Sequence, residues 1–274
     1  MPKVIVSGSF DDLRSRQVRF LEEASRCGPV TVLLWSDETT AALHGSLPKF
    51  PLQERRYLVD ALRFVHRVEI TGARDSQKLI AHIAQLQPSL VVEMDGSRSD
   101  DLADGCRSHQ IPYRLIAESQ LAGFPMPEQR YISSRSDRKK VVVTGCYDWL
   151  HSGHVRFFEE AASLGDLYVV VGHDANVRQL KGEGHPLFSQ EERLYMVQAV
   201  RFVTQARLTS GWGWMDAEPE ITQVIYPQLY VVNEDGDVPE KQAFCQQHGI
   251  EYVVLRRKPK EGLPRRESTY LRGF

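Results

Sequence analysis

The sequence predicts an α/β fold in which the chain forms two similar domains, each a doubly wound parallel sheet with helices on both faces. Short runs of β-favouring residues alternate with helical stretches along the first half of the chain. The pattern of this half then returns in the second half, and each half opens with an apolar strand that leads almost directly into a helix. Strands separated by helices are joined by right-handed crossovers, which make neighbouring strands parallel.

Five strands are expected in the first half of the chain. Each is a short apolar run that is bounded by polar or turn-forming residues, and helical stretches separate the runs. The expected strands cover residues 3–8, 30–35, 67–71, 89–94 and 112–116.

An internal repeat divides the chain into two copies of one fold. Residues 4–24, VIVSGSFDDLRSRQVRFLEEA, and residues 141–161, VVVTGCYDWLHSGHVRFFEEA, are identical at more than half of the aligned positions. Each copy is about 135 residues long, an ordinary domain size. The connecting stretch is rich in turn-forming and charged residues, so we expect domains at 1–137 and 138–274. Two further segments repeat, 54–65 at 192–203 and 90–96 at 230–236.

Composition indicates a globular protein without a membrane span or a nucleic-acid surface. Apolar residues make up 42% and charged residues 26% of the chain, and the net charge is −2, which offers no basic surface for nucleic acid. No apolar run reaches membrane-spanning length, and the first residues lack a signal-peptide pattern. The four cysteines form no CxxC pair, so no metal site or disulfide framework is expected. We expect a reduced, cytoplasmic protein.

Residues 141–154, VVVTGCYDWLHSGH, are the centre of the expected functional site. The run Val141–Thr144 is expected to form a buried strand that ends at Gly145, and a helix follows His154. His151 and His154 therefore lie where a strand meets a helix N-terminus, the place where parallel sheets bind phosphate. Gly153 lets an anion approach the backbone between them. A lone histidine here is more often a surface or cap residue, but the whole string favours a ligand site.

This string resembles the GxFDxxHxGH signature of the cytidylyltransferase-like nucleotidyltransferases, with Tyr147 where phenylalanine is usual. The segments LGDLYVVVGHDANVRQLKG, FSQEERLYMVQAVRFV and RRESTYLRG are also similar to the family and follow in its order. The resemblance covers nearly the whole second half. It implies two tandem Rossmann-like domains of the HxGH nucleotidyltransferase type.

The first copy lacks the histidines that carry the resemblance. Arg14, Arg16 and Gln17 stand where the second copy has the first histidine, the glycine and the second histidine. We expect this copy to be degenerate and without catalysis, while binding of an anion without turnover stays open. The segment ISSRSDR at 132–138 resembles the family's terminal motif and is interpreted as a linker.

The resemblance implies a reaction in which the phosphate of a phosphorylated small molecule attacks the α-phosphorus of a nucleoside triphosphate and releases pyrophosphate. The catalytic residues are expected to be His151 and His154, on the α- and β-phosphates, and Lys181, on the phosphates from the other side. Lys181 is placed in a glycine-containing loop, with a solvated lysine as the alternative. Ser268 and Thr269 are assigned to the β/γ end, and Mg²⁺ is expected to accompany the triphosphate.

Other positions are candidates for binding the two substrates. The alternative role for Asp174 is a helix cap. Arg193 returns as Arg55 in the first copy, and its alternative role is a structural salt bridge. Trp212 and Trp214 could equally lie in the core or line a binding pocket. The alternative role for Asp235 is a turn. The candidates for nucleotide binding are Gly145, Tyr147, Asp148, Gly153, Arg266, Ser268, Thr269 and Arg272. Those for substrate binding are Asp174, Arg193, Trp212, Trp214 and Asp235.

CTP is favoured as the nucleotide, because the histidine string looks most like enzymes that act on glycerol phosphate, ethanolamine phosphate or choline phosphate. The acceptor is expected to be a phosphorylated small alcohol, amine or sugar. Adenylyltransferases that use ATP on sugar phosphates or FMN contain similar strings. A regulatory protein that binds nucleotide without turnover is the alternative from another class. The two copies are expected to form an intramolecular pseudo-dimer, with further homo-oligomers open.

Overall fold

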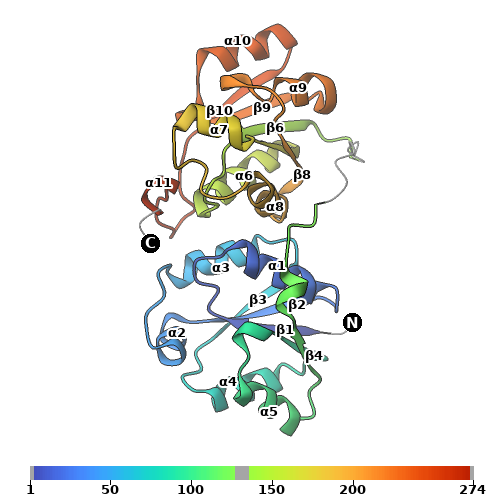
Figure 1. The fold of residues 1–274 in the computed structure, drawn as a ribbon, viewed down its shortest axis with the longest axis vertical. Helices are drawn as coiled ribbons and strands as arrows, with labels where there is room; N and C mark the ends of the chain where they lie inside the picture. The colour runs from blue at the N-terminus through green and yellow to red at the C-terminus, as the bar shows by residue number, and fades with distance from the viewer. Residues whose placement is uncertain (1–2, 127–135, 272–274) are drawn as a thin grey trace. The chain divides into compact units, whose positions relative to one another are not determined.

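A computed structural model describes residues 3–126 and 136–271 of the chain (Figure 1). The chain divides into two compact units, Met1–Gly123 and Phe124–Phe274. The division lies before the boundary expected near residue 137. The ring of Phe124, at the start of the second unit, packs on Tyr195 with ring centroids 5.8 Å apart. Most of the expected linker motif at 132–138 lies outside the described residues.

The first unit contains a five-stranded parallel sheet with the strand order β3-β2-β1-β4-β5. The strands are β1 (Val4–Gly8), β2 (Val30–Trp35), β3 (Val65–Thr71), β4 (Leu90–Met94) and β5 (Tyr113–Ile116). All five strands expected from the sequence are confirmed, with ends that differ by no more than a few residues. Central strands such as β1 and β2 are buried on both faces, which is why they are almost continuously apolar.

Helices cover both faces of this sheet. They are α1 (Ser15–Ser25), α2 (Asp37–His44), α3 (Leu52–Asp60), α4 (Ser76–Gln85) and α5 (Asp100–Ser108). On one face, Leu79 and Ile83 of α4 and Cys106 of α5 pack on Ile5 and Leu33 of the central strands. The apolar positions recur at helical spacing, so each helix turns one face to the sheet.

The second unit repeats this topology. Its sheet has the order β10-β9-β6-β7-β8, which is the order of the first sheet when strands are matched by their position along the chain. The strands are β6 (Lys140–Gly145), β7 (Asp166–Val171), β8 (Val203–Leu208), β9 (Leu229–Asn233) and β10 (Glu251–Leu255). The helices are α6 (Ser152–Leu164), α7 (Asp174–Lys181), α8 (Gln190–Gln198), α9 (Glu218–Glu220), α10 (Pro239–His248) and α11 (Ser268–Leu271).

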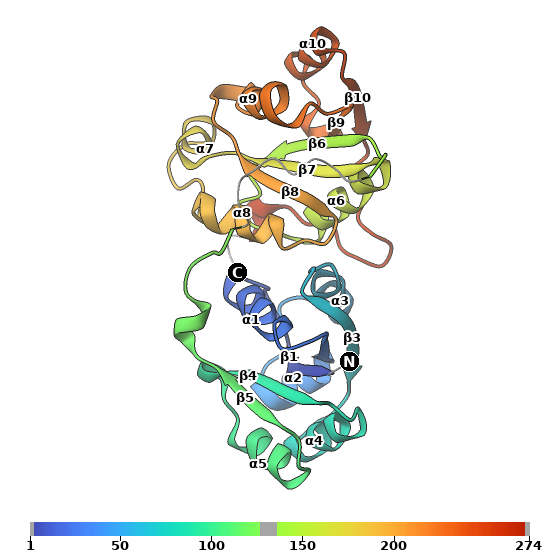
Figure 2. The same ribbon diagram turned by 90° about the vertical axis from the view of Figure 1, so that its right-hand side faces the viewer.

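The core of the second unit lies on both faces of its sheet. Figure 2 shows the sheet between a layer that contains α9 and α10 and a layer that contains α6 and α8. Tyr168 and Tyr230 of the sheet pack with Phe244 and Cys245 of α10 and with Ile221. The apolar layers hold the strand ends in fixed positions along one edge.

A buried arginine joins the strand ends in each unit. In the first unit Arg55 is 1% exposed, donates to the carbonyl groups of Ser9, Trp35 and Phe50, and forms an ion pair with Asp37. Its guanidinium therefore connects the segments that follow β1 and β2 with the start of α3. A buried charge is tolerated when its donors are all bonded in this way.

The second unit repeats the same arrangement. Arg193 is also 1% exposed, donates to the carbonyl groups of Cys146, Gly172 and Phe188, and forms an ion pair with Asp174 at 2.8 Å. These are the corresponding positions, so the two arginines have one structural role.

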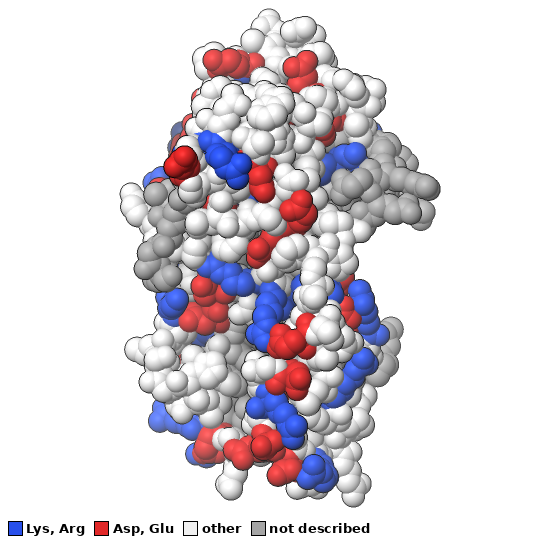
Figure 3. Space-filling model, viewed as in Figure 1, with Lys and Arg blue, Asp and Glu red and all other residues white. Residues whose placement is uncertain are grey.

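The surface carries charges of both signs. On the face drawn in Figure 3, Lys and Arg side chains are interspersed with Asp and Glu side chains over the described residues of both units. None of the helices in the described segments is both long and apolar enough to cross a bilayer.

We predict that Arg55→Ala destabilises the first unit by about 3 kcal/mol, because it leaves three buried carbonyl groups without their donor. Arg56→Ala is the matched control, since the neighbouring arginine is exposed, and it should change the free energy of unfolding by less than about 0.5 kcal/mol. Urea unfolding followed by circular dichroism measures both variants. Equal stability of the two variants would contradict the role of Arg55.

Candidate functional site

The turn between β6 and α6 fixes the centre of the candidate site. Tyr147 has a left-handed backbone, with a φ of 52°, and its ring lies against Gly145. A Cβ at Gly145 would lie 2.8 Å from that ring, so only glycine fits there. The Tyr147 ring also packs edge-on against His154, at 5.3 Å and 80°, and against Phe158. Tyr147 is therefore a buried wall of the site.

The two histidines lie together at the start of α6. His151 is the N-cap of the helix, and its Nδ1 accepts a hydrogen bond from the backbone N–H of Gly153 at 3.1 Å. The His151 and His154 rings are stacked with centroids 3.9 Å apart and planes at 20°. A Cβ at Gly153 would come within 2.9 Å of the His151 ring, which explains the glycine between them. The expected position of both imidazoles at the strand–helix junction is confirmed.

Each imidazole has a buried nitrogen without a partner. His151 Nε2 and His154 Nδ1 make no hydrogen bond with any described residue. Because His151 Nδ1 accepts a hydrogen bond, the neutral ring carries its proton on Nε2, so Nε2 is a free donor. A buried polar group without a partner is costly and is therefore a mark of a ligand site.

The electrostatic field around the histidines is positive. Burial, together with smaller contributions from the guanidinium groups of Arg257 and Arg266, lowers the pKa of His151 to about 3. Burial also holds the pKa of His154 well below its usual value, with contributions from His151, Arg257 and Lys181. Both imidazoles are thus neutral at pH 7, surrounded by cations, an environment that suits an anionic ligand.

A cavity of about 870 Å³ opens beside His154 at the carboxyl ends of the strands. Its walls come from the β6–α6 turn, the end of α7, the segment after β9 and the residues after β10. The lining residues are Thr144, Gly145, Cys146, Tyr147, Asp148, Gly153, His154, Phe157, Lys181, His185, Val232, Asn233, Asp235, Gly236, Lys241, Arg257 and Ser268. Several expected site residues therefore share one cavity.

The structure gives two of the expected carboxylates protein partners. Asp148 is 5% exposed and accepts hydrogen bonds from the backbone N–H groups of Leu187 and Phe188, which holds the segment before α8 against the turn. Asp235 forms an ion pair with Arg257. Both still line the cavity, and their predicted roles in ligand binding stay predictions.

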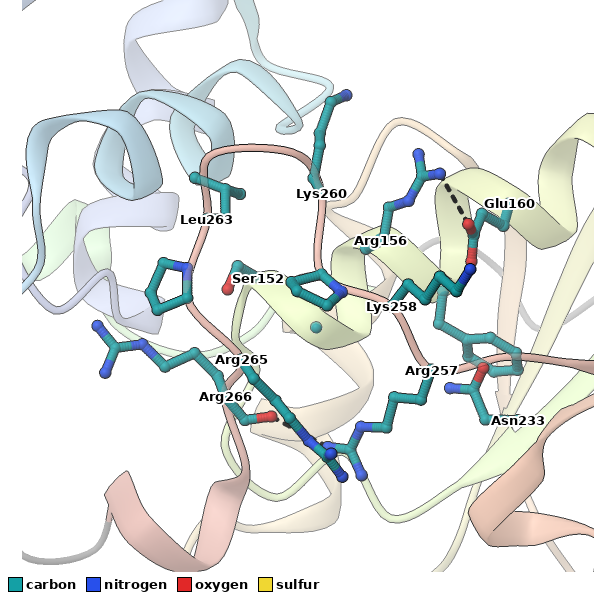
Figure 4. Close-up of a pocket in the computed structure, with 14 residues that line it drawn as sticks. Ser152, Arg156, Glu160, Asn233, Arg257, Lys258, Lys260, Leu263, Arg265 and Arg266 are labelled. Atoms are coloured by element: carbon teal, nitrogen blue, oxygen red, sulfur yellow. Dashed lines mark hydrogen bonds and ion pairs between the residues drawn. The ribbon is translucent and has the colours of Figure 1, made fainter.

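The loop between β10 and α11 forms a second wall, next to the start of α6. Figure 4 shows residues 257–266 passing over Ser152, where they enclose a smaller cavity of about 390 Å³. Arg257 donates to the carbonyl oxygen of Arg266 at 3.0 Å, which closes this loop. The cavity is lined by Ser152, Gly153, Arg156, Phe157, Glu160, Asn233, Arg257, Lys258, Pro259, Lys260, Leu263, Pro264, Arg265 and Arg266.

The C-terminal candidates lie beside the same wall. Ser268 begins α11, as expected for a helix N-terminus, and its hydroxyl lies 3.4 Å from the carbonyl oxygen of Trp149. The side chain of Thr269 and all of Arg272 lie outside the described part of the chain.

Lys181 is not in a loop, as the sequence suggested, but is the last residue of α7. The helix continues through LKG and stops only at Gly182, whose φ of 84° is unfavourable for other residues. Asp174 is the first residue of the same helix, after the N-cap His173, and its carboxylate is the partner of Arg193. The structural salt bridge, the alternative for Arg193, matches its contact with Asp174, whereas the helix cap is His173 and not Asp174.

The two tryptophans are exposed, by 60% for Trp212 and 65% for Trp214, so they are not core residues. Trp212 packs edge-on against His173, with ring centroids 4.8 Å apart. Trp214 lines a further cavity of about 900 Å³, together with Asn176 and Asp216. This cavity lies on the β7 side of the site.

Sequence reasoning missed several residues of these cavities, among them Asn176, Asp216, Lys241 and Arg257. Asn176 is buried and donates to Asp216 at 2.8 Å, and burial raises the pKa of that carboxyl group. Arg257 lies two residues after β10, at the edge where the carboxyl ends of parallel strands bind ligands. Lys241 lies inside a helix, and no local pattern distinguishes it from a solvated lysine.

The corresponding place in the first unit is filled by its own ion pairs. Arg14 pairs with Asp12 at 2.8 Å, and Arg16 pairs with Glu118. Arg16 occupies the position of Gly153, and Glu118 the position of Arg257, since each follows its final strand by the same number of residues. A guanidinium that is bonded to a carboxylate is less available to an anion.

Known proteins resemble this chain mainly through the second unit. A family model described as cytidylyltransferase-like matches residues 142–266. The bifunctional protein HldE of Geobacter sulfurreducens is 46% identical over 149 residues, 48% of this chain and 30% of the relative. The FAD synthase of Aciduliprofundum boonei is 35% identical over 122 residues, 43% of this chain and 78% of that protein.

One relative also aligns with most of the first unit. The HldE protein of Campylobacter curvus is 25% identical over 250 residues, which is 84% of this chain and 48% of the relative. The matched chain thus spans about half or less of the HldE relatives. The family model matches residues 142–266, and this chain covers 78% of the FAD synthase at 35% identity. The chain therefore belongs to the cytidylyltransferase-like family.

Proposed function

We propose that the second unit is a nucleotidyltransferase, which joins a nucleotidyl group from a nucleoside triphosphate to a phosphorylated small molecule and releases pyrophosphate. The observation that carries this proposal is the stacked pair His151 and His154, with free nitrogens in a positive field beside a cavity. The family and the names of its relatives support the same reaction class. The wider activity of the chain, including any role of the first unit, is part of the proposal.

The chemistry needs alignment and charge stabilisation more than base catalysis. A phosphomonoester is already ionised at neutral pH and can attack the α-phosphorus without giving up a proton. One P–O bond forms to the acceptor phosphate as the bond to the leaving pyrophosphate breaks. Neutral imidazole N–H groups and nearby cations stabilise the charge on the transferred phosphoryl group. His151 Nε2 and the cations Lys181 and Arg257 have the chemistry for this role.

ATP becomes the first candidate for the nucleotide, in place of CTP. One relative is named FAD synthase, and FAD contains an adenylyl group, which CTP cannot supply. The family description, cytidylyltransferase-like, is compatible with either nucleotide. A phosphorylated alcohol, amine or sugar stays the proposed acceptor.

Mg²⁺ is proposed to arrive with the triphosphate. The described residues contain no group of three or more His, Cys, Asp or Glu side chains placed to hold a metal ion. Asp148 and Asp235 are engaged by backbone N–H groups and by Arg257. Since Mg²⁺ bound to nucleotides takes most of its ligands from phosphate and water, we derive no step through a protein-held ion.

Pyrophosphate release tests the proposal. The full chain is incubated with ATP or CTP, each with a panel of phosphorylated alcohols, amines and sugars and with FMN, and release is measured by a coupled assay. Release that needs both one nucleotide and one acceptor supports the proposal. Nucleotide binding without release across the panel would instead indicate a regulatory protein.

We predict that His154→Ala lowers kcat for pyrophosphate release roughly 100- to 1,000-fold, because it removes one imidazole of the stacked pair that is proposed to contact the phosphates in the transition state. His66→Ala is the control, since that histidine is exposed on β3 of the first unit. If His154→Ala kept near wild-type turnover and thermal stability, His154 would not be a catalytic residue.

The depressed pKa of His151 has a consequence for stability. Its pKa is about 3 in the folded protein and about 6.5 in the unfolded chain, so between these values only the unfolded chain binds the proton. The second unit should therefore lose stability as the pH falls from about 6.5 toward 3. We expect His151→Gln to lose less than wild type between pH 7 and 5 in urea unfolding. An imidazole NMR resonance of His151 that titrates near pH 6.5 would contradict this.

The first unit should contribute no chemistry to turnover. Arg14 and Arg16 are held by Asp12 and Glu118, and this unit has no histidine pair. We predict that the double variant Arg14→Ala, Gln17→Ala keeps kcat and both KM values for pyrophosphate release within about twofold of wild type, because these half-buried residues lie in the unit without the proposed catalytic residues. A large fall in kcat, with unchanged unfolding, would show that the first unit takes part.

A further inference from the structure

We propose that Lys241 of α10 binds the phosphate of the acceptor, together with Lys181, on the side of the site opposite the bound pyrophosphate. The inference rests on the proposed function and names a substrate-binding residue for it. The ligand that this position takes is a phosphomonoester dianion, whatever small molecule carries the phosphate.

The two larger cavities of the second unit meet at Lys241. The cavity of about 870 Å³ contains His154, and the cavity of about 900 Å³ contains Asn176 and Trp214. Their common wall consists of Thr144, Gly145, Cys146, Lys181, Asp235, Gly236 and Lys241. A phosphate between the two cavities would therefore lie among the residues of this wall, which include both ammonium groups.

Both lysines lack an anionic partner. Within the described residues neither Lys181 nor Lys241 has a carboxylate oxygen within 4.0 Å, and the Nζ of Lys241 donates only to the carbonyl of Gly236, at 3.2 Å. The carboxylate of the common wall, Asp235, is engaged by Arg257, and Asp216, which lines only the cavity of Asn176, accepts a hydrogen bond from Asn176. The two ammonium groups are thus the free charges at the junction.

The position of Lys241 is fixed by packing. Its Nζ lies 5.9 Å from the centroid of the Tyr230 ring, and the Tyr230 hydroxyl is 2.8 Å from that of Thr144 at the end of β6. Tyr230 is 1% exposed, so this platform is rigid. A lysine that is held over a buried ring loses less freedom when it binds an anion than a solvated one would.

The geometry of an in-line displacement indicates that Lys181 and Lys241 contact the acceptor and not the leaving part of the nucleotide. In an in-line reaction the attacking oxygen and the leaving pyrophosphate lie on opposite sides of the α-phosphorus. Arg257 and Arg266 both line the smaller cavity beside the start of α6, where the pyrophosphate is proposed to bind (Figure 4). The attacking phosphate then comes from the other side of His154, where Lys181 and Lys241 lie.

The first unit lacks this lysine. Cys106 of α5 and Cys245 of α10 are both buried in the corresponding helices, and the residue four positions earlier is Leu102 in the first unit and Lys241 in the second. Leu102 is part of the apolar core. The lysine is therefore absent from the unit that also lacks the histidines, as expected for a residue that serves the reaction and not the fold.

Steady-state kinetics of Lys241→Met and Lys241→Arg test the proposal, because methionine keeps the packing over Tyr230 and arginine keeps the charge. We expect Lys241→Met to raise the KM for the acceptor roughly 10- to 100-fold, the usual effect of losing a charged hydrogen bond, and to leave the KM for the nucleotide unchanged. Lys241→Arg should recover part of the loss. Lys78→Met, an exposed lysine of the first unit, is the control for charge. A rise in the nucleotide KM, or no change in either, would overturn the proposal.

A second measurement does not depend on turnover. Acetylation of Lys241 by an amine-reactive reagent is followed by mass spectrometry, and burial, which lowers the pKa of this lysine, favours the reactive amine. Inorganic phosphate at millimolar concentration should slow acetylation of Lys241 several-fold and leave Lys78 unchanged. Protection without pyrophosphate release from any acceptor would keep the phosphate site and remove the proposed function. Equal rates with and without phosphate would remove the site.

Discussion

The short turn between β6 and α6 is the constraint on which the site depends. The Tyr147 ring fills the space over Gly145, and this contact leaves no room for a side chain at the end of the strand. The helix therefore begins close to the sheet, with His151 as its N-cap and His154 one turn later. Because neither ring can move far, their free nitrogens keep the same position whether or not a ligand is bound. Such preorganisation is what makes donors effective in stabilising charge.

The two units show which contacts serve the fold and which serve chemistry. Arg55 and Arg193 make equivalent bonds to equivalent carbonyl groups, and Asp11 and Asp148 each hold the backbone before the next helix. A requirement that is met in both units belongs to the scaffold. At the positions of the stacked histidines and of Lys241, the first unit has Arg14, Gln17 and Leu102. An acid that stands inside a functional motif can thus be a structural residue in a family of enzymes.

The fold followed from the sequence because its elements are set by local patterns. Nearly continuous apolar runs predicted the central strands β1 and β2, which are buried on both faces, and shorter runs of β-favouring residues between helical stretches predicted the edge strands. The histidine site was also predictable, because strand, turn and helix are adjacent in sequence. Residues contributed from elsewhere were not. Lys181 was assigned to a loop, because the glycine that ends α7 is also typical of loops. Lys241 and Arg257 reach the site only through the tertiary fold.

The ion pair between Arg16 and Glu118 has a consequence for how the two units respond to their surroundings. In the first unit the charges at the end of the sheet neutralise each other, so its folding needs no ion from solution. In the second unit the corresponding region has a net positive field, which the lowered pKa of His151 reflects. Its native state carries a repulsion that any bound anion relieves. The unfolding temperature of the second unit should thus depend on the anions in the solution, while that of the first should not.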